Sequence, residues 1–413
     1  MNKFLRKFLI PFLSAVLAVN IIYFGLTFIA DKKAESIAHI GFSNGDVFEN
    51  EAELFFEAEE LFEEELHFTE FRSSYHYDTL DADKQKIYRA YEFALEKGFT
   101  NILIDNQLVG EEKELFDILM LFALDSPVFE QNLRYGYGEF TCGVPVKVGP
   151  IDISTTLDGY YINVKNFDAS FLPKKQEAIE KAKEIVATLP EDISDIDKAE
   201  QLFIYMRKNT EYLLYDDTED EELPVHNYLY DALITGKTHC DGFSNGYSLL
   251  LRTAGIENVE KHFSPDEDSD KVGHTWNAFK IDDKWYNADT TADSLPNKES
   301  SLKSGIYFAF DDELLQYSVD FENIAPRCES YYVKIDYRTE NYDASNISAL
   351  LCSSFKDRNP SWAAVMIDEV ITEKQGKALS QKCADRLQRT ITWMCIETKD
   401  GKSAFFIFEK GLW

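Results

Sequence analysis

The sequence predicts an α+β protein whose core is a helix that begins at a cysteine and packs on an antiparallel sheet. The first observation is an apolar stripe at helical spacing from Phe243 to Ala254, directly after Cys240. The second is a pair of strand patterns that meet at Asp282-Asp283 and predict a hairpin. The third is that mixed helix and strand patterns flank this core, which predicts an N-terminal mixed α/β domain and a small C-terminal α/β unit.

The central helix is expected to open at Cys240 and to end before Gly255, which supplies a left-handed stop. Its apolar face is formed by Phe243, Tyr247, Leu250, Leu251 and Ala254. A thiol in the first turn lies at the positive end of the helix dipole, so we expect a lowered pKa and a nucleophilic thiolate. The alternative is a buried structural cysteine, because unpaired cysteines are among the most buried residues.

A histidine and an aspartate meet in the predicted hairpin. If Asp282-Asp283 forms a two-residue turn, Trp276 pairs with Asp289, and His274 lies diagonal to Asp289 on the same face. Diagonal partners have Cα atoms about 7–8 Å apart, within reach of long side chains. Asp289 is therefore expected to hold one ring nitrogen of His274 while the other nitrogen faces Cys240, as in a nucleophile, base and acid triad.

These residues lie in three motifs that resemble the transglutaminase-like superfamily of papain-type cysteine enzymes, closest to bacterial extracytoplasmic members. The motifs are Gly236–Gly242, His274–Asn277 and Trp285–Thr291. The resemblance covers about residues 167–330 and implies a papain/transglutaminase-like core. It assigns the nucleophile to Cys240, the base to His274 and the acid to Asp289.

Two positions depart from the family pattern, and part of the site stays open. His239 stands where a small or apolar residue is usual, and Asp282-Asp283 replaces an Asp-Gly turn. Relatives complete the oxyanion hole with an upstream side-chain donor. The candidate substrate-binding residues are Tyr212, Tyr215, His226 and Trp276, and the first three are also the candidates for this donor.

The N-terminal segment, residues 1–30, has the features of a signal-anchor. Lys3, Arg6 and Lys7 precede an apolar run of 23 residues, Phe8–Ala30. A transmembrane helix needs about 20 residues, whereas the apolar region of a cleaved signal has about 7–15. The alternative is a signal peptide cleaved near Asn20. Either way the basic N-terminus predicts an ectodomain outside the cytoplasmic membrane, membrane-anchored or secreted.

Residues 31–166 are expected to form the N-terminal domain. Its predicted elements are a helix from Leu54 to Leu66, a helix capped by Asp81 that runs to Lys97, a strand at Asn101–Ile104, a helix at Leu115–Leu124 and strands within Tyr135–Val164. A catalytic grouping is missing from its sequence. A structural or substrate-positioning role is therefore expected.

Residues 167–335 form the predicted transglutaminase-like domain, and residues 336–413 form the C-terminal unit. Two helices open the former, at Pro173–Leu189 and at Asp195–Lys208 with Ser194 as its cap. The loop Asp216–Glu222 is acidic and is expected to be solvated, with a calcium site or a dock for cationic substrate as the alternatives. Later elements are expected at Gly305–Phe310, Ser330–Tyr337, Asn346–Phe355, Trp362–Ile367, Glu373–Leu387, Thr390–Glu397 and Ser403–Phe408, with a turn at Lys399–Lys402.

Charge and cysteine content restrict the partners. The net charge of −32 argues against nucleic acid and against an anionic lipid surface as the main partner. The other five cysteines permit at most two disulfides, and the sequence has no C-x-x-C pair. Ligand spacing for zinc is also missing, so we expect neither a metal nor another cofactor. The sequence does not indicate an oligomeric state.

The function expected from the sequence is acyl transfer on peptide or protein amides by a Cys-His-Asp triad at the cell exterior. The outcome is amide hydrolysis or glutamine-to-amine transfer, and the sequence does not separate the two. The alternative is a non-catalytic transglutaminase-like module for cell-surface or protein attachment. A disulfide-exchange protein is disfavoured because such chemistry needs a paired cysteine.

Overall fold

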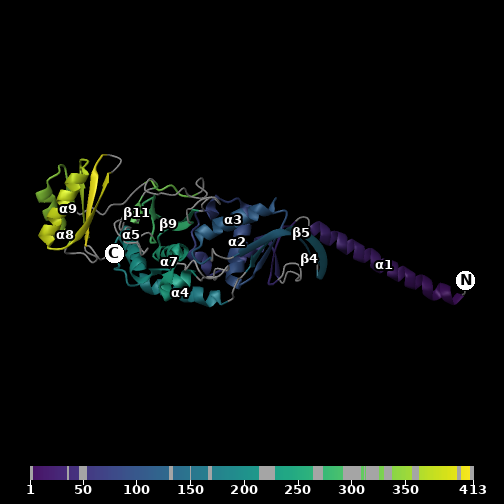
Figure 1. Cartoon of the computed structure of the whole chain (residues 1–413). Coiled ribbons are helices and arrows are strands. Elements are labelled where there is room, and N and C mark those ends of the chain that lie inside the picture. The colour runs from purple at the N-terminus through teal and green to yellow at the C-terminus, as the bar shows by residue number, and fades with distance from the viewer. Residues whose placement is uncertain are drawn as a thin grey trace, which may run out of the picture. The chain divides into compact units, whose positions relative to one another are not determined.

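The described residues form two compact units, one up to Ala178 and one from Ile179 (Figure 1). This computed structural model describes residues 3–34, 37–45, 54–129, 134–148, 150–165, 170–213, 228–263, 273–291, 308–310, 312, 325–329, 337–355, 362–397 and 401–409. Helices combine with mainly antiparallel sheets, which confirms the predicted α+β class.

The first unit contains a five-stranded sheet in the order β2-β1-β3-β5-β4. Its strands are β1 (His39–Ser43), β2 (Leu54–Glu57), β3 (Asn101–Asp105), β4 (Arg134–Val148) and β5 (Ile151–Lys165), and its helices include α2 (Ala82–Lys97) and α3 (Glu112–Asp125). Asp81 accepts a hydrogen bond from the backbone of Lys84, and Gly98 ends α2 in the left-handed conformation. The predicted cap, both helices and the strands are therefore confirmed.

The prediction of a helix from Leu54 to Leu66 is wrong. Residues Leu54–Glu57 form β2, and Ala58–Glu63 form a short 3₁₀ helix, η1. Phe55 pairs with Gly41 of β1, and an added Cβ at Gly41 would lie 2.4 Å from its ring. Because this tight pairing depends on tertiary contacts, it overrides the local helical spacing.

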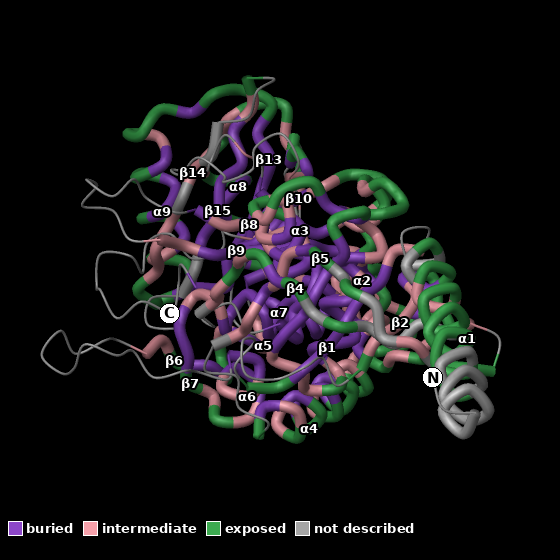
Figure 2. The backbone as a smooth tube through the Cα atoms, turned by 90° about the vertical axis from the view of Figure 1, so that its right-hand side faces the viewer, coloured by how far each residue is buried: buried purple, intermediate pink, exposed green. Residues whose placement is uncertain are grey.

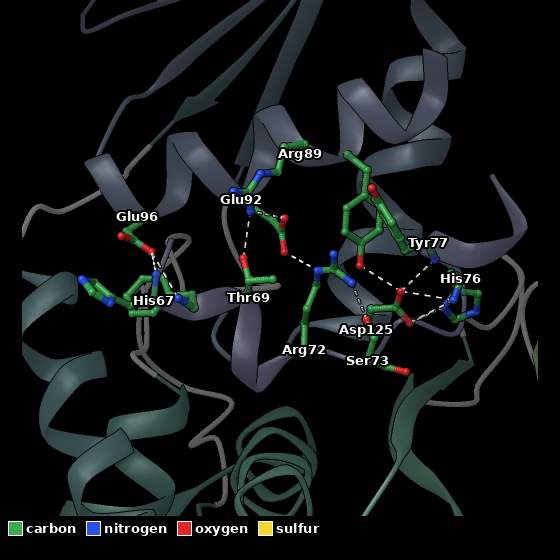
Figure 3. A network of polar contacts seen from close by, with 12 residues as sticks. His67, Thr69, Arg72, Ser73, His76, Tyr77, Arg89, Glu92, Glu96 and Asp125 are labelled. Atoms are coloured by element: carbon green, nitrogen blue, oxygen red, sulfur yellow. Dashed lines mark hydrogen bonds and ion pairs between the residues drawn. The ribbon is translucent and has the colours of Figure 1, made fainter. Parts of the chain in front are cut away.

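A buried polar network joins the remaining short helices, η2 (Phe68–Phe71) and η3 (Tyr77–Thr79), to α2 and α3 (Figure 3). The carboxylate of Asp125 lies 2.7 Å from Nδ1 of His76 and accepts a hydrogen bond of 2.8 Å from the hydroxyl of Tyr88. Arg72 forms an ion pair with Glu92 on α2. These contacts give the buried carboxylates of Asp125 and Glu92 partners, so neither charge is buried alone.

Helix α1 spans Lys3–Ala34, and its side chains between Val16 and Ile29 are largely exposed. Its buried Ala30 packs with Leu103 and Phe140. Among the residues that the structure describes, no helix is long and apolar enough to cross a membrane. The membrane anchor therefore stays a prediction from the sequence.

The second unit begins within α4 and contains the predicted cysteine helix. Its first elements are α4 (Phe171–Val186), α5 (Asp195–Asn209), β6 (Glu211–Tyr212), α6 (Tyr228–Tyr230), the π-helical turn η4 (Asp231–Thr235), β7 (Lys237–Thr238) and α7 (Cys240–Thr253). The antiparallel sheet that follows has the order β11-β10-β9-β8, with β8 (Asn258–Phe263), β9 (His274–Ile281), β10 (Lys284–Ala288) and β11 (Phe308–Phe310). Ser194 caps α5, as predicted.

Helix α7 is buried on its polar face as well as on its apolar face (Figure 2). Asn245 donates a hydrogen bond to Glu260 of β8, and Ser248 donates one to Asn258. Asn277 of β9 donates to the backbone carbonyl of Ser244. These bonds join α7 to β8 and β9 through buried polar side chains.

The C-terminal part of this unit has its own sheet, in the order β12-β13-β15-β14. Its elements are β12 (Tyr337–Thr339), α8 (Ala344–Phe355), β13 (Trp362–Ile367), α9 (Glu373–Leu387), β14 (Ile391–Glu397) and β15 (Ser403–Glu409). A shared apolar core of α8, α9 and the strands confirms the predicted α/β unit. The predicted turn at Lys399–Lys402 and the predicted strands at Gly305–Phe310 and Ser330–Tyr337 lie partly outside the described residues.

Candidate active site

Cys240 is the first residue of α7, as the sequence predicts. The preceding residue, His239, has extended backbone angles and occupies the N-cap position. Gly255 follows the helix with a φ of 79°, which is the predicted left-handed stop. Cys240 is present as a thiol and is half-buried at the start of the helix.

The hairpin has the predicted register. Asp282 and Asp283 have φ values of 48° and 61°, which are the left-handed angles of a type I′ turn. Ile281 pairs with Lys284, and regular pairing continues to Asn277 and Ala288. A non-Gly turn therefore holds the same alignment that Asp-Gly would give.

This register brings His274 to Asp289. Nε2 of His274 lies 2.8 Å from Oδ2 of Asp289, and the two side chains are 18% and 10% exposed. The other carboxylate oxygen, Oδ1, accepts a hydrogen bond of 2.9 Å from the backbone N–H of Thr291. Asp289 therefore holds one ring nitrogen, and its own orientation is fixed by the chain that follows it.

The second ring nitrogen of His274 is available to the thiol. A hydrogen bond joins the side chains of Cys240 and His274, and because Asp289 holds Nε2, this bond uses Nδ1. The structure thus brings together the three residues that the sequence placed in one triad. The order is thiol, imidazole and carboxylate.

The expectation that the helix start lowers the pKa of the Cys240 thiol is wrong. Burial raises the pKa of Cys240 above its ordinary value of 9.0, and the charge of Asp241 adds to the rise. Hydrogen bonds from His274 and from the backbone of Thr275 act in the opposite direction but are weaker. The helix-dipole argument fails because it leaves out desolvation and the adjacent carboxylate.

At His274, the effect of the charged and hydrogen-bonded partners on the pKa outweighs the effect of burial. Burial alone lowers the pKa of His274, but the negative charge of Asp289 and hydrogen bonds to Asp289 and Cys240 raise this pKa well above 6.5. The carboxylate of Asp289 therefore favours the charged, imidazolium form of His274.

The remaining predicted residues have different surroundings. The ring of Tyr212 packs against the rings of Phe243 and His239, at centroid distances of 6.3 Å and 6.0 Å. Trp276 is 1% exposed and stacks near His274, which favours a supporting role over direct contact with substrate. Tyr215, His226 and the acidic loop Asp216–Glu222 lie outside the described residues.

The sequence did not reveal several polar residues around the triad. The hydroxyl of Thr275 donates a hydrogen bond to Asp241, and Nε1–H of Trp276 donates one of 3.2 Å to Asn287. The His-x-Trp-Asn motif and the adjacency of Asp241 to Cys240 were available signals, but neither names its partner. Within the described ranges, no group of three or more metal-binding side chains occurs.

A family comparison agrees with this geometry. Residues 179–290 match the family described as the transglutaminase-like superfamily. The protein carries a transglutaminase-like domain. The match includes Cys240, His274 and Asp289.

Curated relatives of this transglutaminase-like domain include kyphoscoliosis peptidase. The mouse protein is 26% identical over 133 residues, which are 29% of this chain and 20% of the mouse protein. The human protein is 25% identical over the same length, with the same coverage. The matched part of the chain thus spans only a fifth of the curated relatives.

Solved structures similar to this protein include a TGase, with 17% identity, coverage of 61% of each chain and a TM-score of 0.24. The periplasmic domain of TgpA from Pseudomonas aeruginosa has 12% identity and a TM-score of 0.21, and the match covers 34% of this chain and 55% of that chain. These TM-scores are low, and the assignment to the superfamily rests on the sequence match.

Proposed function

We propose that this transglutaminase-like domain transfers acyl groups from peptide or protein amides through a thioester on Cys240. The observation that carries the proposal is the hydrogen-bonded series Cys240, His274 and Asp289, in which Nε2 of His274 lies 2.8 Å from Asp289. A thiol, a base and a group that orients the base are the parts that nucleophilic acyl transfer requires.

The first half of the reaction consumes the amide. The sulfur of Cys240 attacks the carbonyl carbon, and the thiol proton is held on Nδ1 of His274. The tetrahedral intermediate collapses with cleavage of the C–N bond, and His274 gives its proton to the leaving amine. Asp289 keeps Nε2 protonated throughout, so that Nδ1 is the nitrogen that exchanges protons.

The second half regenerates the thiol. Water or an amine attacks the thioester carbon while Nδ1 of His274 accepts a proton from the attacking group. Cleavage of the C–S bond releases an acid or a new amide, and the proton returns to sulfur. The acceptor decides between hydrolysis and glutamine-to-amine transfer, and both use the same residues.

The experiment incubates the purified chain with a thiol-reactive probe and with a library of amide-containing peptides, with and without an added amine. Mass spectrometry identifies the labelled cysteine and any product. Cys240→Ala and His274→Ala are expected to abolish turnover, and Cys352→Ala serves as a control at a buried cysteine. Turnover that survives in Cys240→Ala would contradict the proposal. Binding of peptides without turnover in the wild-type chain would favour the non-catalytic module.

The proposed location is the cell exterior, and it is supported by Lys3, Arg6 and Lys7 in front of the apolar run Phe8–Ala30. External protease applied to intact cells is expected to remove the domain, and carbonate extraction is expected to leave the chain in the membrane fraction. A soluble form that begins near Asn20 would establish a cleaved signal. Full protection of the domain from external protease would contradict the location.

A further inference from the structure

A row of side chains supports His274 from one face of the β8–β9–β10 sheet. The rings of His274 and Trp276 have centroids 5.9 Å apart, and their planes differ by only 19°. The two residues are two positions apart on β9, so they lie on the same face. Because Trp276 is 1% exposed, its ring forms a fixed wall beside the imidazole.

Trp276 is itself held by Asn287. Nε1–H of Trp276 donates to Oδ1 of Asn287 at 3.2 Å, and Nδ2 of Asn287 donates to Oδ1 of Asp312 at 2.9 Å. An indole N–H is only a donor and a carboxylate is only an acceptor, so the two partners fix the orientation of the amide. The position of the indole therefore depends on the carboxylate of Asp312.

Asp312 is anchored through both of its oxygens. Its Oδ1 also accepts a hydrogen bond of 3.0 Å from Nζ of Lys261, and its Oδ2 accepts one of 2.8 Å from the backbone N–H of Cys328. The side chain of Lys261 is 1% exposed, so its charge needs this counterion. Lys261 pairs with Trp276 across β8 and β9, which places the ammonium on the same face as the indole.

We propose that Asp312 is a positioning residue for the His274 base and that it acts through Asn287 and Trp276. The inference rests on the proposed function, because it assigns to Asp312 the task of keeping the imidazole in line with Asp289 and Cys240. Rotation of the imidazole would break its 2.8 Å bond to Asp289 and would also push its ring against Trp276. The indole cannot yield without loss of its bond to Asn287.

A purely structural role makes a different prediction. If Asp312 only neutralises Lys261, its loss lowers thermal stability and leaves the reaction of folded protein unchanged. If Asp312 positions His274, its loss also changes the behaviour of the Cys240–His274 pair. The rate of alkylation of Cys240 as a function of pH reports on this pair without any substrate, and kcat with a peptide substrate reports on the base.

The experiment compares Asp312→Ala, Asp312→Asn, Trp276→Phe and the double variant Asp312→Ala/Trp276→Phe in the full chain. Cys352→Ala is the control, because it removes a buried cysteine side chain from the C-terminal apolar core and leaves every partner of Asp312 and Lys261 in place. Folded fractions are measured first by circular dichroism. Asp312→Asn keeps an oxygen that can accept from Asn287, and it serves as the test if Asp312→Ala does not fold.

We expect Asp312→Ala to lower kcat by about 10- to 100-fold with a smaller change in KM, the size expected when a reacting group is displaced by up to 1 Å. In Asp312→Ala the pH profile of Cys240 alkylation is also expected to shift. Asp312→Asn should retain part of the wild-type kcat, and the control variant should retain all of it. The double variant is expected to match Trp276→Phe alone, because that variant has already lost the N–H through which Asp312 acts.

Two results would overturn the inference. One is a wild-type kcat and alkylation profile in folded Asp312→Ala or, if that variant does not fold, in Asp312→Asn. The other is a double variant in which the two effects multiply. Turnover that is unaffected by Cys240→Ala would instead overturn the proposed function, and the alkylation profile would still test the positioning of His274.

Discussion

Thr275 and Asp241 are joined by a hydrogen bond one residue beyond the Cys240–His274 pair in each segment. The hydroxyl of Thr275 donates to Asp241, so it accepts from Nδ1 of His262, which lies 3.0 Å away. The backbone N–H of Thr275 also donates to the sulfur of Cys240. The first turn of α7 and the start of β9 are thus joined at two successive positions, which fixes the distance between thiol and imidazole.

Asp241→Asn is expected to make Cys240 more reactive near neutral pH. The asparagine keeps an oxygen that accepts from Thr275 but removes the negative charge that helps to raise the pKa of the thiol. The rate of iodoacetamide labelling of Cys240, measured from pH 6 to pH 10, should reach half its maximum at a lower pH than in the wild-type chain.

Thr275→Val is the matched comparison, because it leaves the charge of Asp241 in place and removes the hydroxyl between the two segments. A hydrogen bond to a charged group contributes about 1.5–3 kcal/mol, so this variant should lose stability and show no gain in labelling rate. Equal labelling profiles for wild type and Asp241→Asn would show that the carboxylate does not influence the thiol.

The pH dependence of kcat/KM is expected to be bell-shaped and displaced toward alkaline pH. The pKa of His274 is raised above 6.5 and the pKa of Cys240 is raised above 9.0. At a pH below both pKa values, the thiol and the imidazole therefore carry two exchangeable protons between them. The active pair carries one proton, whichever atom holds it. Activity should therefore rise as pH passes the raised value of His274 and fall only above the ordinary range of a thiol.

Steady-state kinetics over pH 5 to 10 with a substrate that does not titrate would measure both limbs. The two apparent values belong to the coupled pair rather than to single residues. Labelling of Cys240 in the same buffers separates effects on the enzyme from effects on substrate binding. An acid limb below 6.5 would contradict the raised pKa of His274.

Asp289→Asn is expected to keep the fold and to lose kcat by roughly three to four orders of magnitude, the loss that follows when a base is held in the wrong tautomer. The same change removes the negative charge that raises the pKa of His274, whereas burial continues to lower it. The acid limb of the pH profile should consequently move to lower pH.

Thermal melting of Asp289→Asn, with Thr291→Ala as a control in the same segment, distinguishes loss of fold from loss of function. The control keeps the backbone N–H that donates to Asp289. An Asp289→Asn variant with wild-type kcat, or with an unmoved acid limb, would remove Asp289 from the proposed mechanism.

The sequence predicted those parts of the site that follow from local geometry. The register of the hairpin depends only on a two-residue turn and strict alternation, so the approach of His274 to Asp289 was predictable before any tertiary contact was known. The start of α7 at Cys240 was predictable for the same reason, from an apolar period and a terminal glycine.

The contacts that the sequence missed are those between distant segments. Lys261 and Asp312 are 51 positions apart, and their ion pair leaves no periodic pattern in the chain. The pairing of Phe55 with Gly41 likewise converted a predicted helix into a strand. The direction of the pKa shift at Cys240 was missed because burial, its largest cause, is a property of the packed fold.

Gly242→Ala is expected to destabilise the chain although it adds a good helix former to α7. Alanine in place of glycine usually gains about 1 kcal/mol in a helix interior. An added Cβ at Gly242 would lie only 2.0 Å from Oγ1 of Thr238 in β7, so the first turn of the helix must move away. Overpacking of this kind costs about 1–3 kcal/mol. The movement would also displace Cys240, two residues earlier, and lower kcat.

Thr238→Ala in the same chain tests this cause. The hydroxyl of Thr238 is buried and makes no hydrogen bond to the residues that the structure describes, so its removal alone should be mild. Thr238→Ala removes Oγ1, the atom nearest to the added Cβ of residue 242, but it leaves the Cβ of residue 238 at 2.7 Å from that atom. The double variant Gly242→Ala/Thr238→Ala should therefore recover part of the lost stability. Gly110→Ala, where no atom lies within 4 Å, controls for the substitution itself. Thermal melting and the labelling rate of Cys240 measure the two effects. A Gly242→Ala chain as stable and as reactive as wild type would show that the approach of α7 to β7 does not position the thiol.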